Sequence, residues 1–589
     1  GNINEETGEY YKWTDFLGPS NSDNPSLQPS FPAPYFDSIE EKDIHVASQV
    51  WPLDEYNTML LDNTHPPNWI DPIATQHTKN AYLYDMVVIG AGAGGLVSAA
   101  SAAGLGARVA LIEAHLMGGD CLNVGCVPSK ALIHAANLAH TVRGNTEHLA
   151  DSGITIDPAA IKVDFGKVME RMRRIRAQIS HHDSAQRFTK ELGVEVFFGK
   201  GRFTSDRTVS VNDTTLTFKR AVVATGGYPS LIPMEGLQEL FDKSIAVDQQ
   251  EREPRPVIVT NETIFNLTSQ PKKMVVIGAG VIGMELAQAM QRLGTKVIVT
   301  GRSGNVLRKE DEDLAQLVKD QMIKDGVEFR LHVSQFQSIK LTGKILGNGH
   351  PEMTMNIAET NDGSISETEI TCDAVLVATG RKPNVTGLNL ETAGIDYDAK
   401  KGLIVNDKLQ TTNPRVYGVG DCASEFKFTH AADFTARAVI RNALFFGREK
   451  MSALLIPYAT YTSPEIASVG LYESDLKERG IAYRIIEKNL EDNDRAICEG
   501  NTVGMVRFRV DAKTDKILGA SIVGANAGNM IGEVALAMQS GTGLGKLASV
   551  IHPYPTISEA IRQAGDVYNK TRLTPTVRSI LRGMVKLQR

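Results

Sequence analysis

One heptapeptide occurs twice in this chain, and this repeat limits the possible folds more than any other feature. Met-Val-Val-Ile-Gly-Ala-Gly stands at Met86–Gly92 and again at Met274–Gly280. Each copy has the pattern of a buried strand that runs into a glycine-rich turn and then into a helix. In the spacing Gly-x-Gly-x-x-Gly, the glycines allow a tight turn, close approach of backbone to a pyrophosphate, and close helix–strand packing. The six glycines are Gly90, Gly92, Gly95, Gly278, Gly280 and Gly283. We therefore predict two dinucleotide-binding strand–turn–helix units.

The two copies differ at the residue that ends the second strand of each unit. The first unit has Glu113 there, and a carboxylate at this place accepts hydrogen bonds from a ribose 2′-hydroxyl. The second unit has Gly301, followed by Arg302 and by Arg308. Guanidinium groups bind a 2′-phosphate, which a carboxylate would repel. The first site thus suits FAD and the second suits NADPH over NADH. The alternative is that the arginines lie on a solvated loop.

A pair of cysteines follows the first unit. Cys121 and Cys126 stand five residues apart in Gly118-Gly-Asp-Cys-Leu-Asn-Val-Gly-Cys-Val-Pro-Ser-Lys130. A turn at the start of a helix would allow a disulfide between them. Such a disulfide beside a flavin accepts two electrons, and a helix N-terminus with a nearby lysine favours the thiolate. The alternative is two unrelated buried thiols.

This segment resembles the signature of the flavoprotein disulfide reductases, which include glutathione reductase, dihydrolipoamide dehydrogenase and mercuric reductase. The resemblance extends over about residues 81–575. It implies that Cys126 is the sulfur next to the flavin and Cys121 the sulfur that engages substrate. It also implies an ion pair between Lys130 and Glu285 near the flavin and the nicotinamide. Further cofactor-binding positions that it implies are Gly119, Lys130, Thr225, Gly226, Gly380 and Asp421.

The resemblance also implies the fold. We expect an α/β protein with two Rossmann-like dinucleotide-binding domains, for FAD and NADPH, an α+β C-terminal dimerisation domain and an irregular N-terminal extension. The expected FAD domain comprises residues 81–235 and 376–452, interrupted by an NADPH domain at 236–375. The expected interface domain covers residues 453–574 and makes a homodimer. Residues 1–80 form the expected arm, and residues 575–589 a basic amphipathic helix.

The segment that the resemblance places at the substrate-binding end differs from that of the glutathione and lipoamide enzymes. Those enzymes have a histidine base five residues before a glutamate, whereas the residue five before Glu559 is Tyr554. A tyrosine in that position resembles mercuric reductase, where it helps to bind the metal ion. With an unperturbed pKa near 10, tyrosine is a poor base at neutral pH. The alternative base is His552, two residues earlier.

These features predict an NADPH-dependent FAD disulfide oxidoreductase that is similar to mercuric reductase. Its electrons would pass from NADPH to FAD, then to Cys121–Cys126, and then to a soft metal ion or a small disulfide. The chain lacks the cysteines that mercuric reductases use to deliver mercury: no cysteine precedes Cys121, and the C-terminus has no vicinal pair. Two alternatives stay open. One is a flavin-based quinone or oxygen reductase that does not need the disulfide, and the other is an assembly component that binds a partner through its charged termini.

Charge is concentrated at the two ends of the chain. Residues 1–80 hold 13 acids and three lysines, a balance of −10 against −7 for the whole chain. Their tryptophans, Trp13, Trp51 and Trp69, suggest an arm that wraps the dimer. No acid follows Asp566, and we expect the basic C-terminal helix to pack on protein, with contact to acidic lipid as the alternative.

Composition limits the classes of partner and the compartments that suit this chain. No apolar run reaches the ~18 residues of a membrane span, no basic domain indicates nucleic-acid binding, and no cluster of metal ligands is predicted. Five scattered cysteines do not suit a disulfide-stapled secreted domain. Thiol–disulfide cycling suits a reducing compartment, such as the cytoplasm or the stroma of a plastid or mitochondrion.

Overall fold

Each copy of the repeated heptapeptide forms an inner strand of its own sheet. The structure is a computed structural model, and it describes residues 50–67, 69–72, 83–143, 146–157, 160–245 and 255–588. Trp13 and most of the predicted arm therefore lie outside the described residues.

The first sheet has the strand order β3-β2-β1-β6-β5-β4, with β19 beside β6. Its central strands are parallel because β1 pairs with β2 and β6, and β6 with β19, in the same direction. The strands are β1 (Leu83–Ile89), β2 (Val109–Glu113), β3 (Glu195–Phe198), β4 (Arg202–Ser205), β5 (Thr208–Val211), β6 (Thr214–Val223) and β19 (Val416–Gly418). Helices α3 (Ala93–Gly104) and α12 (Thr429–Leu444) pack against each other. Both contribute to one apolar core with the sheet.

The second sheet is wholly parallel, with the order β11-β10-β9-β15-β8. Its strands are β8 (Ile258–Val259), β9 (Lys273–Ile277), β10 (Lys296–Thr300), β11 (Glu328–Arg330) and β15 (Ala374–Val377). A separate antiparallel sheet consists of β12 (Val333–Ile345), β13 (Pro351–Asn361) and β14 (Ser364–Cys372). Helix α10 (Val281–Leu293), which follows the second glycine turn, packs against α5 (Cys126–Arg143). The two dinucleotide-binding units therefore contact each other through the helix that begins at Cys126.

The third large sheet, called the third sheet below, is antiparallel, with the order β20-β21-β24-β23-β22 and its own apolar core. Its strands are β20 (Tyr458–Thr460), β21 (Glu465–Gly470), β22 (Tyr483–Asn489), β23 (Met505–Asp511) and β24 (Ile517–Gly524). Helix α15 (Ala527–Gln539) packs on β21 and β24, and α17 (Glu559–Thr571) packs on β22 and β23. Arg507 of β23 is buried and pairs at 3.0 Å with Asp311, just before α11 (Glu312–Lys324). This ion pair joins the third sheet to the second unit, and the three sheets together confirm the predicted fold class.

Most of the other helices and strands are short. The helices are α4 (Gly119–Asn123), α6 (Thr146–Asp151), α7 (Phe165–Ser180), α8 (Ala185–Lys190), α9 (Leu237–Ile245), α13 (Glu473–Glu478), α14 (Asp494–Cys498) and α16 (Leu544–Leu547), of which only α7 is long. The strands are β7 (Gly227–Pro229), β16 (Arg381–Pro383), β17 (Tyr397–Asp398) and β18 (Gly402–Leu403). Across the described ranges, no helix combines the length and the apolar character that a membrane span requires.

The predicted irregular arm contains a helix, α2 (Glu55–Thr64), which corrects the expectation for that part of residues 1–80. Asp54 caps it by accepting a hydrogen bond from the backbone N–H of Asn57. Its buried residues include Asn57, Thr58 and Thr64 as well as two leucines, so the buried side lacks the apolar periodicity that predicts helices. The described tryptophans of this segment contact their own chain: the Trp69 indole donates to Val196 O at 3.0 Å.

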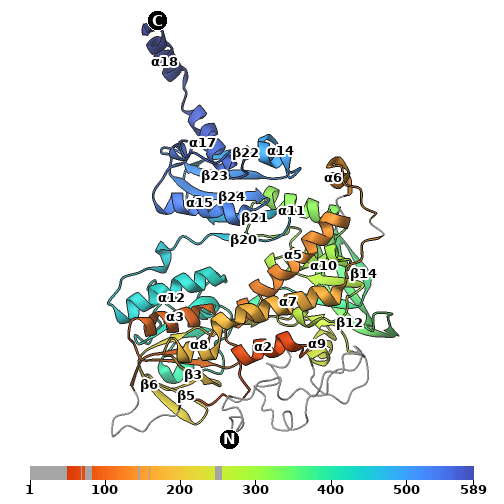
Figure 1. Cartoon of the computed structure of the whole chain (residues 1–589), viewed down its shortest axis with the longest axis vertical. Coiled ribbons are helices and arrows are strands. Elements are labelled where there is room, and N and C mark those ends of the chain that lie inside the picture. The colour runs from red at the N-terminus through yellow and green to blue at the C-terminus, as the bar shows by residue number, and fades with distance from the viewer. Residues whose placement is uncertain are drawn as a thin grey trace.

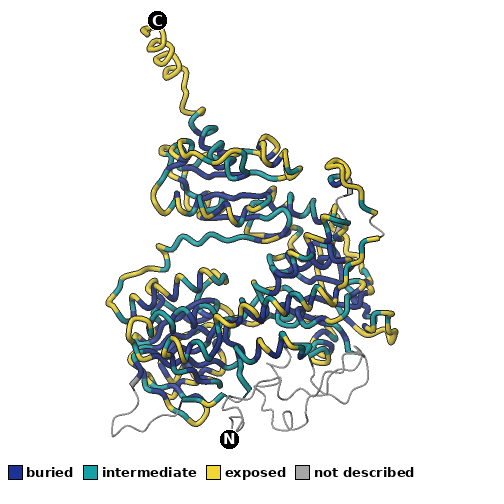
Figure 2. The backbone as a smooth tube through the Cα atoms, in the orientation of Figure 1, coloured by how far each residue is buried: buried dark blue, intermediate teal, exposed yellow. Residues whose placement is uncertain are grey.

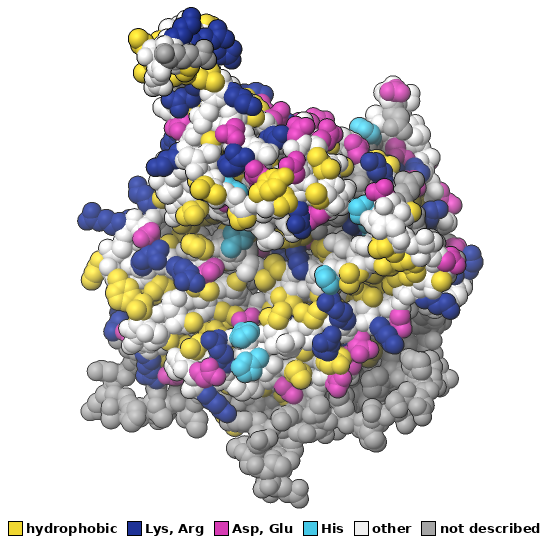
Figure 3. All heavy atoms as spheres, turned by 45° about the horizontal axis from the view of Figure 1, so that its top comes forward, with side chains coloured by type: hydrophobic (Ala, Val, Ile, Leu, Met, Phe, Trp, Pro, Cys, Tyr) yellow, Lys and Arg dark blue, Asp and Glu magenta, His cyan; other side chains and the backbone are white. Residues whose placement is uncertain are grey.

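The C-terminal helix forms as predicted but does not pack on its own chain. Helix α18 (Pro575–Leu587) has proline in its first turn and Thr574 as its cap. None of its residues is buried, and it projects from the third sheet's domain (Figures 1 and 2). Its apolar residues, such as Ile580 and Met584, are 58% and 57% exposed. Figure 3 shows apolar and basic side chains together on this helix. The expected packing of this face on protein is thus not found within the described chain.

Candidate functional site

Both glycine turns have the shape that a pyrophosphate requires. A Cβ on Gly95 would lie 1.7 Å from Gly90 O, and one on Gly283 would lie 2.0 Å from Gly278 O. The third glycine of each motif is therefore needed for helix and turn to approach each other. By contrast, a Cβ on Gly280 would meet no atom within 4 Å, so the second turn has open space in front of the N-terminus of α10. The shape of both turns therefore fits a bound phosphate.

The buried carboxylate of Glu113 lies beside the first turn, and the carboxylate of Asp421 is half-buried. Glu113 is 8% exposed, and it accepts hydrogen bonds from Ala91 N at 2.6 Å and His115 N at 2.7 Å. Burial raises the pKa of Glu113 to about 7 and also raises the pKa of Asp421. Carboxylate oxygens that are shielded from water can accept hydrogen bonds from the hydroxyl groups of a ribose and a ribityl chain. The residues of this site therefore fit FAD, with Glu113 at the adenosine end.

Arg381 connects the FAD site to the redox segment. Its guanidinium pairs with Asp120, which precedes Cys121, and its Nε lies 3.6 Å from Asp421. The sequence identified Arg381 only as the residue after Gly380. Thr225, just after β6, donates to Asn384 O, just after β16, at 2.5 Å. This hydrogen bond links the ends of the two strands. Gly226 and Gly380 both have positive φ, and a Cβ on either would meet open space.

The second turn carries the predicted arginines. Gly301 follows β10 directly, and Arg302 and Arg308 are both exposed beyond it. The Arg302 guanidinium lies 5.6 Å from the centre of the Phe336 ring. Leu307 N donates to Ala279 O at 2.9 Å, which ties the arginine-bearing loop back to the glycine turn. This arrangement leaves both cations free to meet a phosphate and fits NADPH.

The two cysteines lie together as thiols of different acidity. Cys121 lies in α4, and Cys126 begins α5. A hydrogen bond from Cys121, with help from Thr429 and the charge of Lys130, lowers the pKa of Cys126 to about 6. The Thr429 hydroxyl oxygen is 3.4 Å from the Cys126 sulfur. The same hydrogen bond and burial raise the pKa of Cys121. Cys126 is therefore the thiolate of the reduced pair at neutral pH, as the resemblance implies for the sulfur next to a flavin.

An ion pair stands one helical turn from Cys126. Lys130 Nζ lies 2.8 Å from Glu285 Oε2, and the Glu285 side chain is only 5% exposed. The other oxygen of Glu285 accepts from Tyr461 N at 2.8 Å, and the Lys130 ammonium lies 4.5 Å over the Tyr461 ring. The structure thus brings the predicted pair together. Sequence reasoning missed Thr429 and Tyr461, because no local pattern indicates contacts across about 300 residues.

The three residues predicted at the substrate end have partners within the third domain. The Tyr554 hydroxyl donates to Asp494 at 2.9 Å, and this bond is the main cause of a raised pKa of Tyr554. His552 Nε2 lies 3.0 Å from Glu533, and its Nδ1 lies 3.0 Å from Val550 O. Glu559 pairs with Arg562 at 2.7 Å. Both ring nitrogens of His552 thus face oxygen atoms of the third domain.

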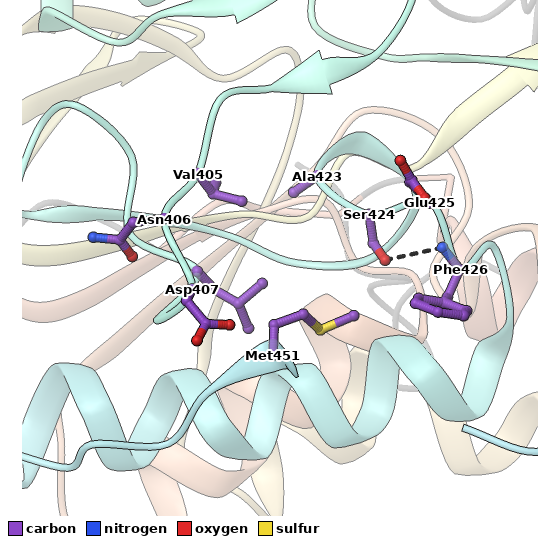
Figure 4. A pocket seen from close by; sticks show the side chains of 9 residues that line it. Val405, Asn406, Asp407, Ala423, Ser424, Glu425, Phe426 and Met451 are labelled. Atoms are coloured by element: carbon purple, nitrogen blue, oxygen red, sulfur yellow. Dashed lines mark hydrogen bonds between the residues drawn. The ribbon is translucent and has the colours of Figure 1, made fainter. Parts of the chain in front are cut away.

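Other candidate features carry no chemistry of this kind. Cys372 and Cys422 are buried, whereas Cys498 is exposed. Within the described ranges, no group of three metal-ligating side chains is present. A hollow of about 300 Å³ is lined by Val405, Asn406, Asp407, Leu409, Ala423, Ser424, Glu425, Phe426 and Met451 (Figure 4). None of these residues is a predicted site residue.

The pKa of Cys126 leads to a first prediction. In the reduced protein, the rate of Cys126 alkylation by iodoacetamide is expected to rise with pH with a midpoint near 6. Cys121→Ala removes the main hydrogen-bond donor, so the midpoint should move up toward the ordinary thiol value of about 8.5. Mass spectrometry of the labelled peptide measures both. An unchanged midpoint in Cys121→Ala would show that Cys121 does not acidify its neighbour.

Comparison with known proteins identifies relatives over most of the chain. Residues 84–436 match the family model "Pyridine nucleotide-disulphide oxidoreductase", and residues 456–565 match the dimerisation domain of the same family. A mercuric reductase of Lysinibacillus sphaericus is 30% identical over 90% of this chain and 90% of its own length. A dihydrolipoyl dehydrogenase of Thermus scotoductus is 31% identical over 83% of this chain and 98% of its own length. The HOCl-induced flavoprotein disulfide reductase RclA of Escherichia coli has a similar fold, with a TM-score of 0.68 and 23% identity, over 82% of this chain and 100% of its own.

Proposed function

The chain belongs to the pyridine nucleotide-disulphide oxidoreductase family, and we propose that it delivers electrons from NADPH, through the Cys121–Cys126 pair, to a soft metal ion or a small disulfide. It is a flavoprotein oxidoreductase of the homodimeric, FAD- and NAD(P)H-dependent type that its relatives represent. When bound, FAD supplies the two-electron chemistry between the nicotinamide and the disulfide.

The unequal acidity of the two thiols is the observation that carries this proposal. Cys126 is held as a thiolate beside Lys130, whereas Cys121 keeps its proton. A disulfide acceptor would be attacked by Cys121 sulfur, which releases one thiol and forms a mixed disulfide. Cys126 then attacks Cys121 sulfur, which releases the second thiol and closes the Cys121–Cys126 bond. Two electrons leave the pair; one released thiol takes the proton of Cys121, and the other takes a proton from solvent.

The substrate end favours a soft metal ion over a small disulfide. Disulfide exchange needs a base that removes the Cys121 proton, but Asp494 raises the pKa of Tyr554, and the ring nitrogens of His552 face Glu533 and Val550 O. A thiophilic cation needs no such base, because metal binding itself displaces thiol protons. This reasoning supports the proposal of a reaction similar to that of mercuric reductase.

The remaining assignments are part of the same proposal. We assign the FAD domain to residues 81–235 and 376–452, the NADPH domain to 236–375 and the interface domain to 453–574. NADPH-linked thiol cycling suits a reducing compartment, either cytoplasm or organelle stroma. The apolar and basic faces of α18 suit contact with an acidic membrane surface.

A panel of acceptors tests the proposal. NADPH oxidation by the FAD-loaded enzyme is measured with mercuric ion, cupric ion, a small disulfide and a quinone. We expect turnover with at least one soft cation or disulfide, and we expect Cys121→Ser to abolish it. Cys498→Ser is the control, because this thiol is exposed but lies outside the pair. Turnover with the quinone alone, retained in Cys121→Ser, would instead support a flavin-based reductase. The absence of any turnover would contradict the enzymatic proposal.

A further inference from the structure

Helix α2 packs mainly against α7, and both share an apolar cluster with the segment that holds the two cysteines. Helix α2 precedes the first residue that the family model matches. The side chains of Leu60 and Leu61 are 0% and 2% exposed, and they belong to one apolar cluster with Leu122. The other buried members are Val50, Leu53, Leu116 and Ala177, and Val127 packs against them. Leu122 directly follows Cys121, and Val127 directly follows Cys126. The cluster therefore lies behind the redox turn.

A buried arginine connects α2 to the backbone of that turn. Arg176 is 0% exposed, and its Nη1 donates to Asn123 O at 2.5 Å while its Nη2 donates to Asn57 Oδ1 at 2.7 Å. Asn123 ends α4, so Arg176 satisfies a carbonyl at the end of the helix that contains Cys121. The Asn123 side chain donates in turn to Met117 O at 3.0 Å and Gly119 O at 2.9 Å. Asn57 of α2 thus orients the arginine that fixes the turn between the two cysteines.

Both ends of α2 are also attached to the body of the chain. Trp51 N, before the helix, donates to Asn266 Oδ1 at 3.1 Å. Thr64 O, at the last residue of the helix, accepts from Met117 N at 2.9 Å. Arg173 Nε donates to Asp54 Oδ2 at 2.5 Å beside the helix cap. α2 is therefore held in place independently of Arg176.

We propose that α2 is a positioning element for the redox pair, which acts through Asn57 and Arg176 on the turn Cys121–Cys126. This inference rests on the proposed function of the pair. The reaction concerned is the disulfide plus two electrons and one proton giving the Cys121 thiol and the Cys126 thiolate. Its equilibrium depends on how well the reduced chain holds the two sulfurs at bonding distance, since that sets their effective concentration. A turn that α2 and Arg176 keep in the closing geometry favours the disulfide.

Loosening this contact should make the disulfide easier to reduce. In the FAD-loaded full chain, we expect Asn57→Ala and Arg176→Met to lower the equilibrium constant for disulfide formation about tenfold, which raises the midpoint potential by about 30 mV. The midpoint is measured by equilibration in dithiothreitol redox buffers followed by mass-tagging of free thiols. Asn57→Asp keeps an acceptor oxygen for Arg176, and its midpoint should stay near that of the wild type.

Asn63→Ala is the matched control on the same helix. The Asn63 side chain donates to Ser180 Oγ at 2.8 Å and makes no hydrogen bond to the redox turn. The Asn63→Ala variant should therefore have the wild-type midpoint potential, even if its melting temperature falls. Equal midpoints in wild type, Asn57→Ala and Arg176→Met, with lower melting temperatures, would overturn the inference and leave α2 a purely structural helix. If the wild-type cysteines formed no disulfide in any buffer, the proposed function itself would fail. If Arg176→Met does not fold, Asn57→Ala decides the question.

Discussion

Cys126→Ser is expected to abolish the long-wavelength absorbance that a thiolate gives beside oxidised FAD, whereas Cys121→Ser should show that absorbance without any reductant. The reason is the unequal acidity of the two thiols: in the reduced pair Cys126 has a pKa of about 6. In Cys121→Ser the serine hydroxyl can replace the Cys121 hydrogen bond, and Thr429 and Lys130 still lower the pKa of Cys126. The wild type should gain the band after two-electron reduction by NADPH. Both variants should lose thiol-dependent turnover by a factor on the order of 10⁴ or more, since each removes one sulfur of the exchange.

Anaerobic titration with NADPH, followed by absorbance, measures the band, and steady-state turnover is recorded on the same samples. Cys372→Ser is a suitable control, because this thiol is buried away from the pair. A wild type whose titration bleaches the flavin at once, with no band before it, would make the two cysteines bystanders.

Arg302→Ala is expected to lower kcat/KM for NADPH by about ten- to a hundredfold and to leave kcat/KM for NADH nearly unchanged. A charge-assisted contact to a 2′-phosphate is worth about 1.5–3 kcal/mol, and only NADPH carries that phosphate. The wild type should accordingly prefer NADPH strongly. Arg308→Ala should act in the same direction, because the residue lies on the same exposed loop.

Lys319→Ala provides the comparison for a general loss of positive charge. Its ammonium lies 5.9 Å over the Phe329 ring in the same domain, and the residue is separated from the loop by the start of α11. Initial rates over a range of both coenzymes give the two ratios. Equal use of NADPH and NADH by the wild type would refute the assignment of the arginines.

The elements that the sequence predicted well are those specified by neighbouring residues. The repeated heptapeptide identified β1 and β9, and glycine spacing located both turns, because each requirement is met within a short stretch of chain. The Lys130–Glu285 pair came from a resemblance, since no periodicity joins residues so far apart. Helix α2 was missed because Asn57 and Thr58 occupy its buried side. Arg176 gave no signal either, because an arginine within a helix normally indicates a solvent-facing position.

The first sheet also has a consequence for the order in which the protein is made. Strand β6 pairs with β1 and also with β19. In the chain, however, β19 (Val416–Gly418) comes after all strands of the second sheet. During synthesis from the N-terminus, the second parallel sheet, from Ile258 to Val377, can close while the first still lacks its last strand. The nascent chain therefore carries an open sheet edge at β6 until the ribosome has passed Gly418. The domain that begins first is completed after the one inserted into it.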